Sequence, residues 1–246
     1  MTMIAAGDLH RLWRNLPIGT LKDIIGAGTC LVLAPHPDDE SLGCGGLIAR
    51  CCAELRPPVV VILTDGSGSH PHSQQYPPGK LAGLREQEAI RAVQVLGMQP
   101  NRLYFLRAID TAAPHNGPMF EATVRRLVEL VRAFDCSAIL ATWQFDPHCD
   151  HEAAALVAAE TARMTRVRLL SYPVWGWTLG DDTPVEASPV RGWRLDISPH
   201  LAAKRRAIAT HASQYGELIS DDPGGFQLPP ALLRDMDGPW ETFLLP

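Results

Sequence analysis

Short apolar runs alternate with helical patterns along most of this chain, and the alternation limits the possible folds more than any other feature. Strands that read as continuous Val, Ile and Leu are typical of a parallel sheet that is covered on both faces. The crossovers between such strands are right-handed. The sequence therefore predicts an α/β fold, with a Rossmann-like, doubly wound and mostly parallel sheet. The expected strands are 29–34, 59–64, 102–106, 137–142 and 168–174, and the expected helices between them are 42–55, 81–96, 120–134 and 152–163.

The length and the ends of the chain complete this prediction. With 246 residues and 46% hydrophobic content, the chain suits a single domain that spans 1–246. Leu9 and Trp13 would share one face of a lead-in helix at about 8–25. A tail from about 216 to 246, which is rich in Pro and Gly, is expected to wrap the surface.

Two elements and two loops are expected outside the alternating part. Residues 191–198 alternate as an added strand, and 199–211 read as a helix with Ser198 as its cap. The stretches 66–79 and 178–189 have no periodicity. Because long irregular loops in compact domains are usually functional or disordered, these two are predicted to border a pocket.

The charge and the cysteines exclude several classes of function. The net charge of −5 offers no basic footprint for nucleic acid, and no stretch is long and apolar enough for stable membrane insertion. The N-terminus lacks the basic, apolar and small order of a signal peptide. None of the six cysteines forms a C-x-x-C pair, so reduced thiols and a cytoplasmic location are expected. The sequence leaves a homo-oligomer open.

An imidazole and three carboxylates stand close together directly after the first apolar run, 29–34. They are His36, Asp38, Asp39 and Glu40. His36 and Asp39 are three residues apart in a turn, so both side chains can face one point. Asp38 is offset between them and can approach the same point without coordinating a metal.

A second cluster, His148, Asp150 and His151, follows the run 137–142. Ligands in open α/β sheets gather at the carboxyl ends of the strands, so the two clusters are predicted to meet. Two ligands from one loop and a third from the other would leave a position open for water, which is the pattern of a catalytic zinc site. Cys149 lies between two candidate site residues and could add a thiolate.

These residue types suit the hydrolysis of an amide. Water on a divalent metal is acidified toward neutrality and becomes the nucleophile, and Asp38 could take its proton as general base. A cationic His148, held by Asp150, could stabilise an oxyanion and then protonate the leaving amine. A solvated turn or a helix N-terminus is the alternative for the acidic cluster, and Glu40 would favour the helix dipole there. Two such clusters, each after its own strand, make coincidence a weaker explanation.

At these residues the chain resembles the LmbE-like, or PIG-L-type, zinc-dependent de-N-acetylase family. The ordered matches cover about residues 29 to 214, which is most of the chain. They are Pro35 to Glu40 with the glycines after it, Thr64-Asp65-Gly66, Arg85 to Ala89, His148 to His151, and His211 to Gln214.

The resemblance implies that zinc, or another divalent metal, is held by His36, Asp39 and His151. It also implies that Asp38 is the base and that His148 is an electrostatic catalyst. The fold and the activity that the resemblance implies agree with the argument from residue spacing. Spacing alone did not decide whether His148 or His151 is the ligand.

The resemblance further suggests that Arg85 and Asp110 contact the substrate. Some family members have a tyrosine where this chain has Asp146. The expected substrate is an N-acetylated or N-acylated amino sugar in a small glycoconjugate. Two alternatives are a metallo-hydrolase of another bond, such as an ester, and a non-catalytic nucleotide-binding Rossmann module. The second would need a Gly-x-Gly-x-x-Gly motif, and the nearest piece, 43–46, lacks it.

Overall fold

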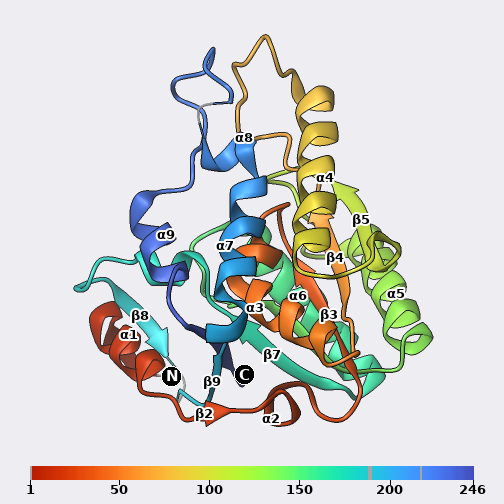
Figure 1. Ribbon diagram of the computed structural model, residues 1–246, viewed down its shortest axis with the longest axis vertical. Helices are drawn as coiled ribbons and strands as arrows, with labels where there is room; N and C mark the ends of the chain where they lie inside the picture. The colour runs from red at the N-terminus through yellow and green to blue at the C-terminus, as the bar shows by residue number, and fades with distance from the viewer. Residues whose placement is uncertain (1, 188–189, 217) are drawn as a thin grey trace.

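The centre of the structure is a mostly parallel sheet with helices on both faces (Figure 1). The computed structural model describes residues 2–187, 190–216 and 218–246. Within them the large sheet has eight strands in the order β2-β9-β10-β7-β6-β3-β4-β5, and only β10 runs antiparallel to its neighbours. The strands are β2 (Ile18–Gly19), β3 (Thr29–Ala34), β4 (Val59–Thr64), β5 (Leu103–Ala108), β6 (Cys136–Thr142), β7 (Arg168–Tyr172), β9 (Gly192–Asp196) and β10 (Trp240–Leu244). The predicted fold class is confirmed.

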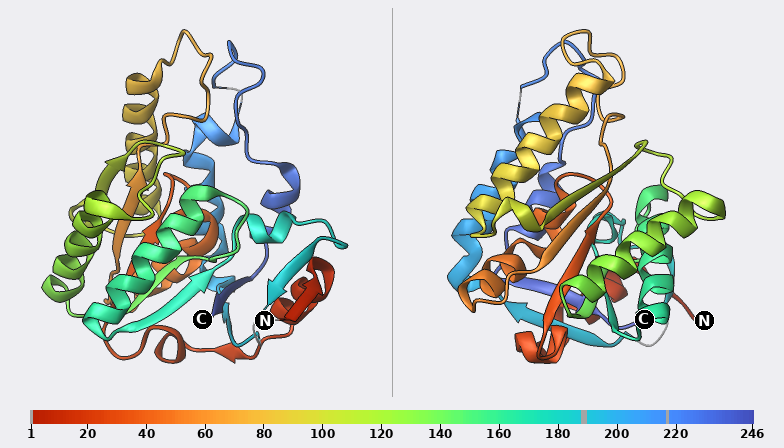
Figure 2. Two further views of the ribbon diagram at one scale, coloured as in Figure 1. Left: turned by 180° about the vertical axis from the view of Figure 1, so that it is seen from behind. Right: turned by 90° about the vertical axis from the view of Figure 1, so that its right-hand side faces the viewer.

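Strand β3 shows why its sequence is apolar throughout. Cys30 and Val32 enter one core, whereas Leu31 and Leu33 enter the core on the opposite face, as the period of two in a strand requires. Two helical layers close these cores, and Figure 2 shows them from behind and from the side. The first layer contains α3 (Asp39–Ala53), α4 (Pro78–Val95) and α7 (Leu201–Thr210), and the second contains α5 (Gly117–Ala133) and α6 (Cys149–Thr165).

The order of the strands reverses direction next to β3. The chain proceeds from β3 outward to β4 and β5, and then returns to place β6 on the other side of β3. Connections on the two sides of such a switch point diverge and leave a crevice at the carboxyl ends of the strands. Both candidate clusters follow these two strands, so the topology brings them to one crevice.

The lead-in helix predicted at 8–25 is wrong as one element. The chain forms α1 (Ala6–Arg14), then β2, and then α2 (Leu21–Ile25). Pro17 lies three residues after the last residue of α1, and a proline cannot continue the backbone hydrogen bonding of a helix. Thr20 starts α2 with a capping box. The first residues also form β1 (Thr2–Ala5), which pairs antiparallel with β8 (Pro184–Ala187).

The tail does not merely wrap the surface. It contains α9 (Pro230–Met236), and its last strand, β10, is inserted between β7 and β9. Glu241 of this strand is buried and accepts hydrogen bonds from Lys204 Nζ at 2.8 Å and from the backbone of Gly46 at 2.7 Å. A buried lysine without such a carboxylate would be strongly destabilising, so these contacts secure the tail in the sheet.

The region before the tail agrees with the sequence in part. The predicted strand 191–198 corresponds to β9, and the predicted helix to α7. Ser198 does not cap that helix, because its N–H and hydroxyl both donate to Asp196 and a 3-10 turn, Ser198–His200, comes first. The remaining short elements are Pro100–Arg102, Trp175–Thr178 and α8 (Ala212–Tyr215). Among the described residues, every helix is too short or too polar to cross a membrane.

Candidate metal and catalytic site

The loop after β3 brings His36 and Asp39 together, as their spacing predicts. Asp39 Oδ2 accepts a hydrogen bond from the backbone N–H of His36 at 3.0 Å and lies 3.2 Å from His36 Nδ1. Asp39 is the first residue of α3, so its place is set by the strand end on one side and by the helix on the other. Both side chains are buried.

The loop after β6 places His148 and His151 at the start of α6. His148 is the N-cap, and its Nδ1 accepts from the backbone N–H of Asp150 at 3.2 Å. His151 lies in the first turn and is fully buried, with Nε2 at 3.3 Å from Asp39 Oδ2. The carboxylate of Asp39 therefore lies between the imidazoles of His36 and His151, which come from loops more than one hundred residues apart.

The donor set fits a divalent metal. His151 Nε2 is buried and makes no hydrogen bond to any described residue, although it faces the site. Ligand atoms of His36, His148 and His151 lie within 4.8 Å of one another. Two imidazoles and one carboxylate are ligands that zinc accepts, and a site with three protein ligands leaves a position open.

Asp146 orients His151, and the sequence analysis did not assign this role. Its Oδ2 lies 2.9 Å from His151 Nδ1, and the carboxylate also accepts backbone N–H groups of Val174, Trp175 and Gly176. A carboxylate on the second nitrogen of an imidazole fixes the tautomer that a metal ligand needs. The position, two residues before His148, was the only available signal.

Asp38 is held in a strained conformation beside His36 and Asp39. Its φ of 149° is rare for a residue with a side chain, and such strain costs of order 1–3 kcal/mol. Glu40 Oε2 accepts the Asp38 N–H at 2.9 Å, and Arg85 Nη2 donates to Asp38 Oδ2 at 3.1 Å. Burial raises the pKa of Asp38 and Arg85 lowers it, and with a further raising effect of Asp39 the pKa is about 6.

Glu40 is a buried brace rather than a solvated helix-end carboxylate. Its Oε1 accepts from the Ser41 hydroxyl at 2.6 Å and lies 3.0 Å from His211 Nε2. Burial lowers the pKa of His211, but the charge and hydrogen bond of Glu40 outweigh burial and raise it. Through Glu40, the segment after α7 supports the backbone of Asp38.

Asp150 and Asp110 both face His36 rather than the second cluster. His36 Nε2 lies 3.0 Å from Asp150 Oδ2 and 3.3 Å from Asp110 Oδ1. Burial lowers the pKa of His36, but hydrogen bonds with Asp110, Asp150 and Asp39 outweigh burial and raise it well above its usual range.

The sequence analysis expected the carboxylate of Asp150 to hold a cationic His148, and the observed contacts differ from this. The described hydrogen bond between these two residues comes from the backbone N–H of Asp150 to His148 Nδ1. The carboxylate of Asp150 instead accepts the N–H groups of Thr111 and Ala113, in addition to its contact with His36. Burial, followed by the charges of His36 and His151, lowers the pKa of His148. Both effects favour a neutral imidazole.

His36, Asp38 and Asp39 line a cavity of about 170 Å³. Its polar side includes Arg85, Asp110 and His148, as the sequence analysis expects of groups near a substrate. Its apolar side includes Trp175 and Phe226, whose rings are 5.6 Å apart and cross at 71°. Phe226 belongs to the tail, and no local pattern in the sequence pointed to it.

The two predicted border loops differ in position. Gly68 and Ser69 of the first loop line the cavity, and Asp221 of the tail accepts from Ser73, Gln74 and Gln75 to hold this loop. The described residues of the second loop, 178–187, do not line the cavity, because part of them pairs with β1 as β8; residues 188–189 lie outside the described residues.

Comparison with known proteins agrees with this geometry. Residues 31–162, more than half of the chain, match the family described as PIG-L: GlcNAc-PI de-N-acetylase, and the chain belongs to this family. A 1D-myo-inositol 2-acetamido-2-deoxy-alpha-D-glucopyranoside deacetylase of Nocardia farcinica is 28% identical over 76% of this chain and 80% of its own length.

Two solved structures share the fold. An N,N'-diacetylchitobiose deacetylase from Pyrococcus horikoshii has a TM-score of 0.65 and 20% identity, and the match covers 97% of this chain and 92% of that one. A 4-carboxy-2-hydroxymuconate hydratase from Pseudomonas putida KT2440 has a TM-score of 0.58 and 22% identity, over 76% of this chain and 80% of that one. Because the second protein is named as a hydratase, the fold by itself does not decide the reaction.

Proposed function

We propose that this protein is a metal-dependent amidohydrolase that removes an N-acetyl group, or a longer N-acyl group, from an amino sugar in a small glycoconjugate. One observation carries the proposal. In a member of the PIG-L family, His36, Asp39 and His151 converge at the switch point of the sheet, with Asp38 beside them. The N. farcinica relative is named as a deacetylase of such a compound.

His36, Asp39 and His151 would hold Zn²⁺ or another divalent ion. When bound, the ion would acidify water and polarise the amide carbonyl. Asp110 and Asp150 support the role of His36, because their carboxylates contact its Nε2 and fix the orientation of the ring. Asp146 does the same for His151. Each proposed imidazole ligand thus has its own orienting carboxylate, as metal-binding histidines usually do.

Asp38 is the proposed general base. It lines the cavity, and its Oδ2 is oriented by Arg85. Arg85 also donates to the carbonyl groups of Pro37 and Gly66, so its guanidinium ties three segments together around Asp38. A carboxylate fixed in this way can remove a proton from attacking water and return it to the departing amine without reorienting.

His148 is the proposed oxyanion donor, and it can act as a neutral imidazole. Because its Nδ1 accepts from the backbone of Asp150, the proton of the neutral ring resides on Nε2. That N–H is available to a substrate oxygen in the cavity, which His148 lines. A donor that is already oriented stabilises the charge that develops in the transition state.

The walls of the cavity suit a sugar. Trp175 and Phe226 offer an aromatic surface for the apolar face of the ring, and Arg85 and Asp110 can meet hydroxyl groups opposite. Gln214 adds a further candidate, because its Oε1 is buried without a hydrogen-bond partner among the described residues. Such an acceptor would favour a ligand that donates from a hydroxyl group.

The experiment is amine release from a panel of N-acyl glucosamine derivatives by the zinc-loaded protein, with nitrophenyl esters and nucleotides in parallel. We expect turnover of the amides that a chelator abolishes and zinc restores. Turnover confined to esters would replace the proposal with another hydrolase. Nucleotide binding without turnover of any amide would favour the non-catalytic module.

A further inference from the structure

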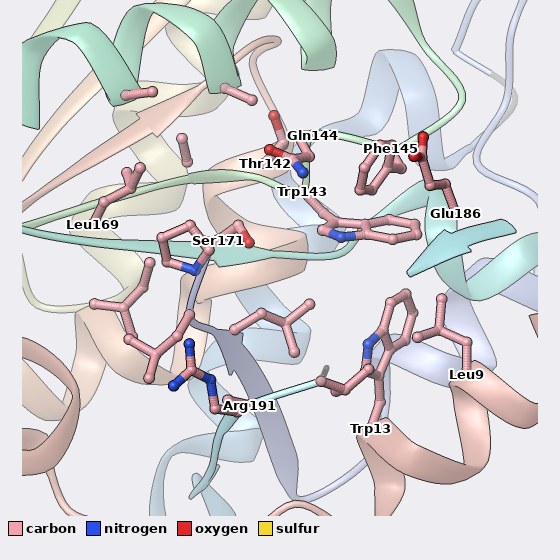
Figure 3. A pocket seen from close by; sticks show the side chains of 18 residues that line it. Leu9, Trp13, Thr142, Trp143, Gln144, Phe145, Leu169, Ser171, Glu186 and Arg191 are labelled. Atoms are coloured by element: carbon pink, nitrogen blue, oxygen red, sulfur yellow. The ribbon is translucent and has the colours of Figure 1, made fainter. Parts of the chain in front are cut away.

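A second cavity, of about 140 Å³, lies away from the proposed catalytic site (Figure 3). It is lined by α1, the end of β6, β7, one side of α6, residues 186 and 190–191, and the end of the chain at 244–246. Its aromatic lining includes Trp13, Trp143 and Phe145. No described residue lines both cavities. The proposed reaction therefore does not use this space.

Trp13 presents an unsatisfied donor to this cavity. Its side chain is fully buried, and its Nε1–H has no hydrogen-bond partner among the described residues. The ring is held in place by Trp143 and Trp177, which it contacts edge to face at 5.0 and 4.8 Å between centroids. A buried N–H without an acceptor is destabilising, and a ligand oxygen would remove that cost.

The other polar side chains on the lining are those of Thr142, Gln144, Ser171, Glu186 and Arg191. In the part of the chain that the structure describes, the Thr142 hydroxyl donates to the His151 carbonyl, whereas neither the Ser171 hydroxyl nor the Arg191 guanidinium has a side-chain hydrogen bond or an ion pair. Arg191 is exposed, so it can meet an anion at the opening. Glu186 brings a carboxylate to the lining and lies away from Arg191 in Figure 3, and Pro246, the last residue of the sequence, also lines the cavity.

We propose that this cavity binds a small carboxylate with an apolar body. The volume is close to that of an engineered protein cavity of roughly 150 Å³ that accepts benzene, so the body would be a ring or a chain of about six carbons. The Trp13 N–H would donate to an oxygen of the carboxylate, and the charge of Arg191 at the opening would favour an anion. The walls formed by Trp143 and Ala155 would enclose the body.

The test uses the indole N–H signals in a ¹H–¹⁵N NMR spectrum of the full chain, which has six tryptophans. Trp13→Phe identifies the Trp13 signal, and Trp193→Phe is the matched control for losing an indole outside the cavity. We expect hexanoate and benzoate to shift the Trp13 signal saturably, in both metal-loaded and chelated protein, while 1-hexanol binds at least about tenfold more weakly.

Two variants keep the proposal open to refutation. Trp13→Phe should weaken hexanoate binding about tenfold by calorimetry, because it removes only the N–H donor. Ala155→Leu, at a half-buried position on the wall, should fill the space and abolish binding even if the first variant folds poorly. Binding that vanishes on chelation, that both variants leave unchanged, or that 1-hexanol matches would overturn the proposal. The proposal does not rest on the amidohydrolase activity.

Discussion

The two loops that form the candidate site are held in different ways. The loop after β3 contains a strained residue, Asp38. Arg85 from α4 holds its carboxylate, and Glu40, which His211 contacts, holds its backbone N–H. The loop after β6 is held mainly by one carboxylate, Asp146, which is satisfied by three backbone N–H groups and by His151. Both loops carry proposed metal ligands, but the backbone strain lies at the proposed base, Asp38, whereas the network of Asp146 orients the proposed ligand His151.

Removal of a proposed ligand should have the largest effect. His151→Ala takes away an imidazole whose Nε2 faces Asp39, so metal content should fall from about one ion per chain to near zero, and activity should fall to background. Elemental analysis after zinc loading measures the first, and amine release the second. His72→Ala is the matched control, since His72 is exposed. Full zinc retention in His151→Ala would remove this residue from the ligand set.

Asp38→Asn should separate catalysis from metal binding. The change keeps size and removes basicity, so kcat should fall about 100-fold or more, the usual scale for loss of a general base. Zinc content should match that of the wild type. Because the ion pair with Arg85 is also lost, thermal unfolding should be recorded to show that the variant is folded. Unchanged turnover in a folded, zinc-loaded variant would be incompatible with the proposed mechanism.

Asp146→Asn should weaken the metal site without removing a ligand. The amide can no longer accept from His151 as a carboxylate does, so zinc affinity should fall by about 10- to 100-fold, the scale known for orienting residues. Competition with a coloured chelator measures this affinity. At saturating zinc, kcat should recover most of its wild-type value. An unaltered affinity would show that the backbone of the loop alone orients His151.

Glu40→Gln should have the smallest effect of the four. The buried brace between Asp38 and His211 loses its charge, so kcat should fall about tenfold, which corresponds to a net loss of about 1.4 kcal/mol. Zinc content and KM should stay near their wild-type values, because Glu40 is a positioning residue. Glu54→Gln, at the exposed end of α3, is the matched control. A fall in zinc affinity as large as the fall in kcat would show that Glu40 acts on the metal site and not only on the position of Asp38.

Local patterns were sufficient for the central fold and the location of the site. Continuous apolar runs had to be strands buried on both faces, and β3, β4 and β6 lie within a residue of their predicted bounds. His36 and His151 follow two of these strands, so the edge of a parallel sheet brings them together. These inferences depend only on periodicity and on the direction of the strands, which are properties of short segments.

Partners distant in the sequence decided the remaining features. Asp150 turns its carboxylate to His36 rather than to His148, two residues away. The tail supplies β10 to the sheet and Phe226 to the cavity, although its Pro and Gly content indicated only a surface segment.

The sequence by itself therefore determined the order of the strands and helices in the central part of the chain, the strand ends that carry the chemistry and the residue types available there. The tertiary structure decided which atoms those side chains meet, as for Glu40 with His211. The physical reason is range. Backbone preference and hydrophobic periodicity act over a few residues, whereas the partner of a buried polar atom depends on which distant segment packs beside it.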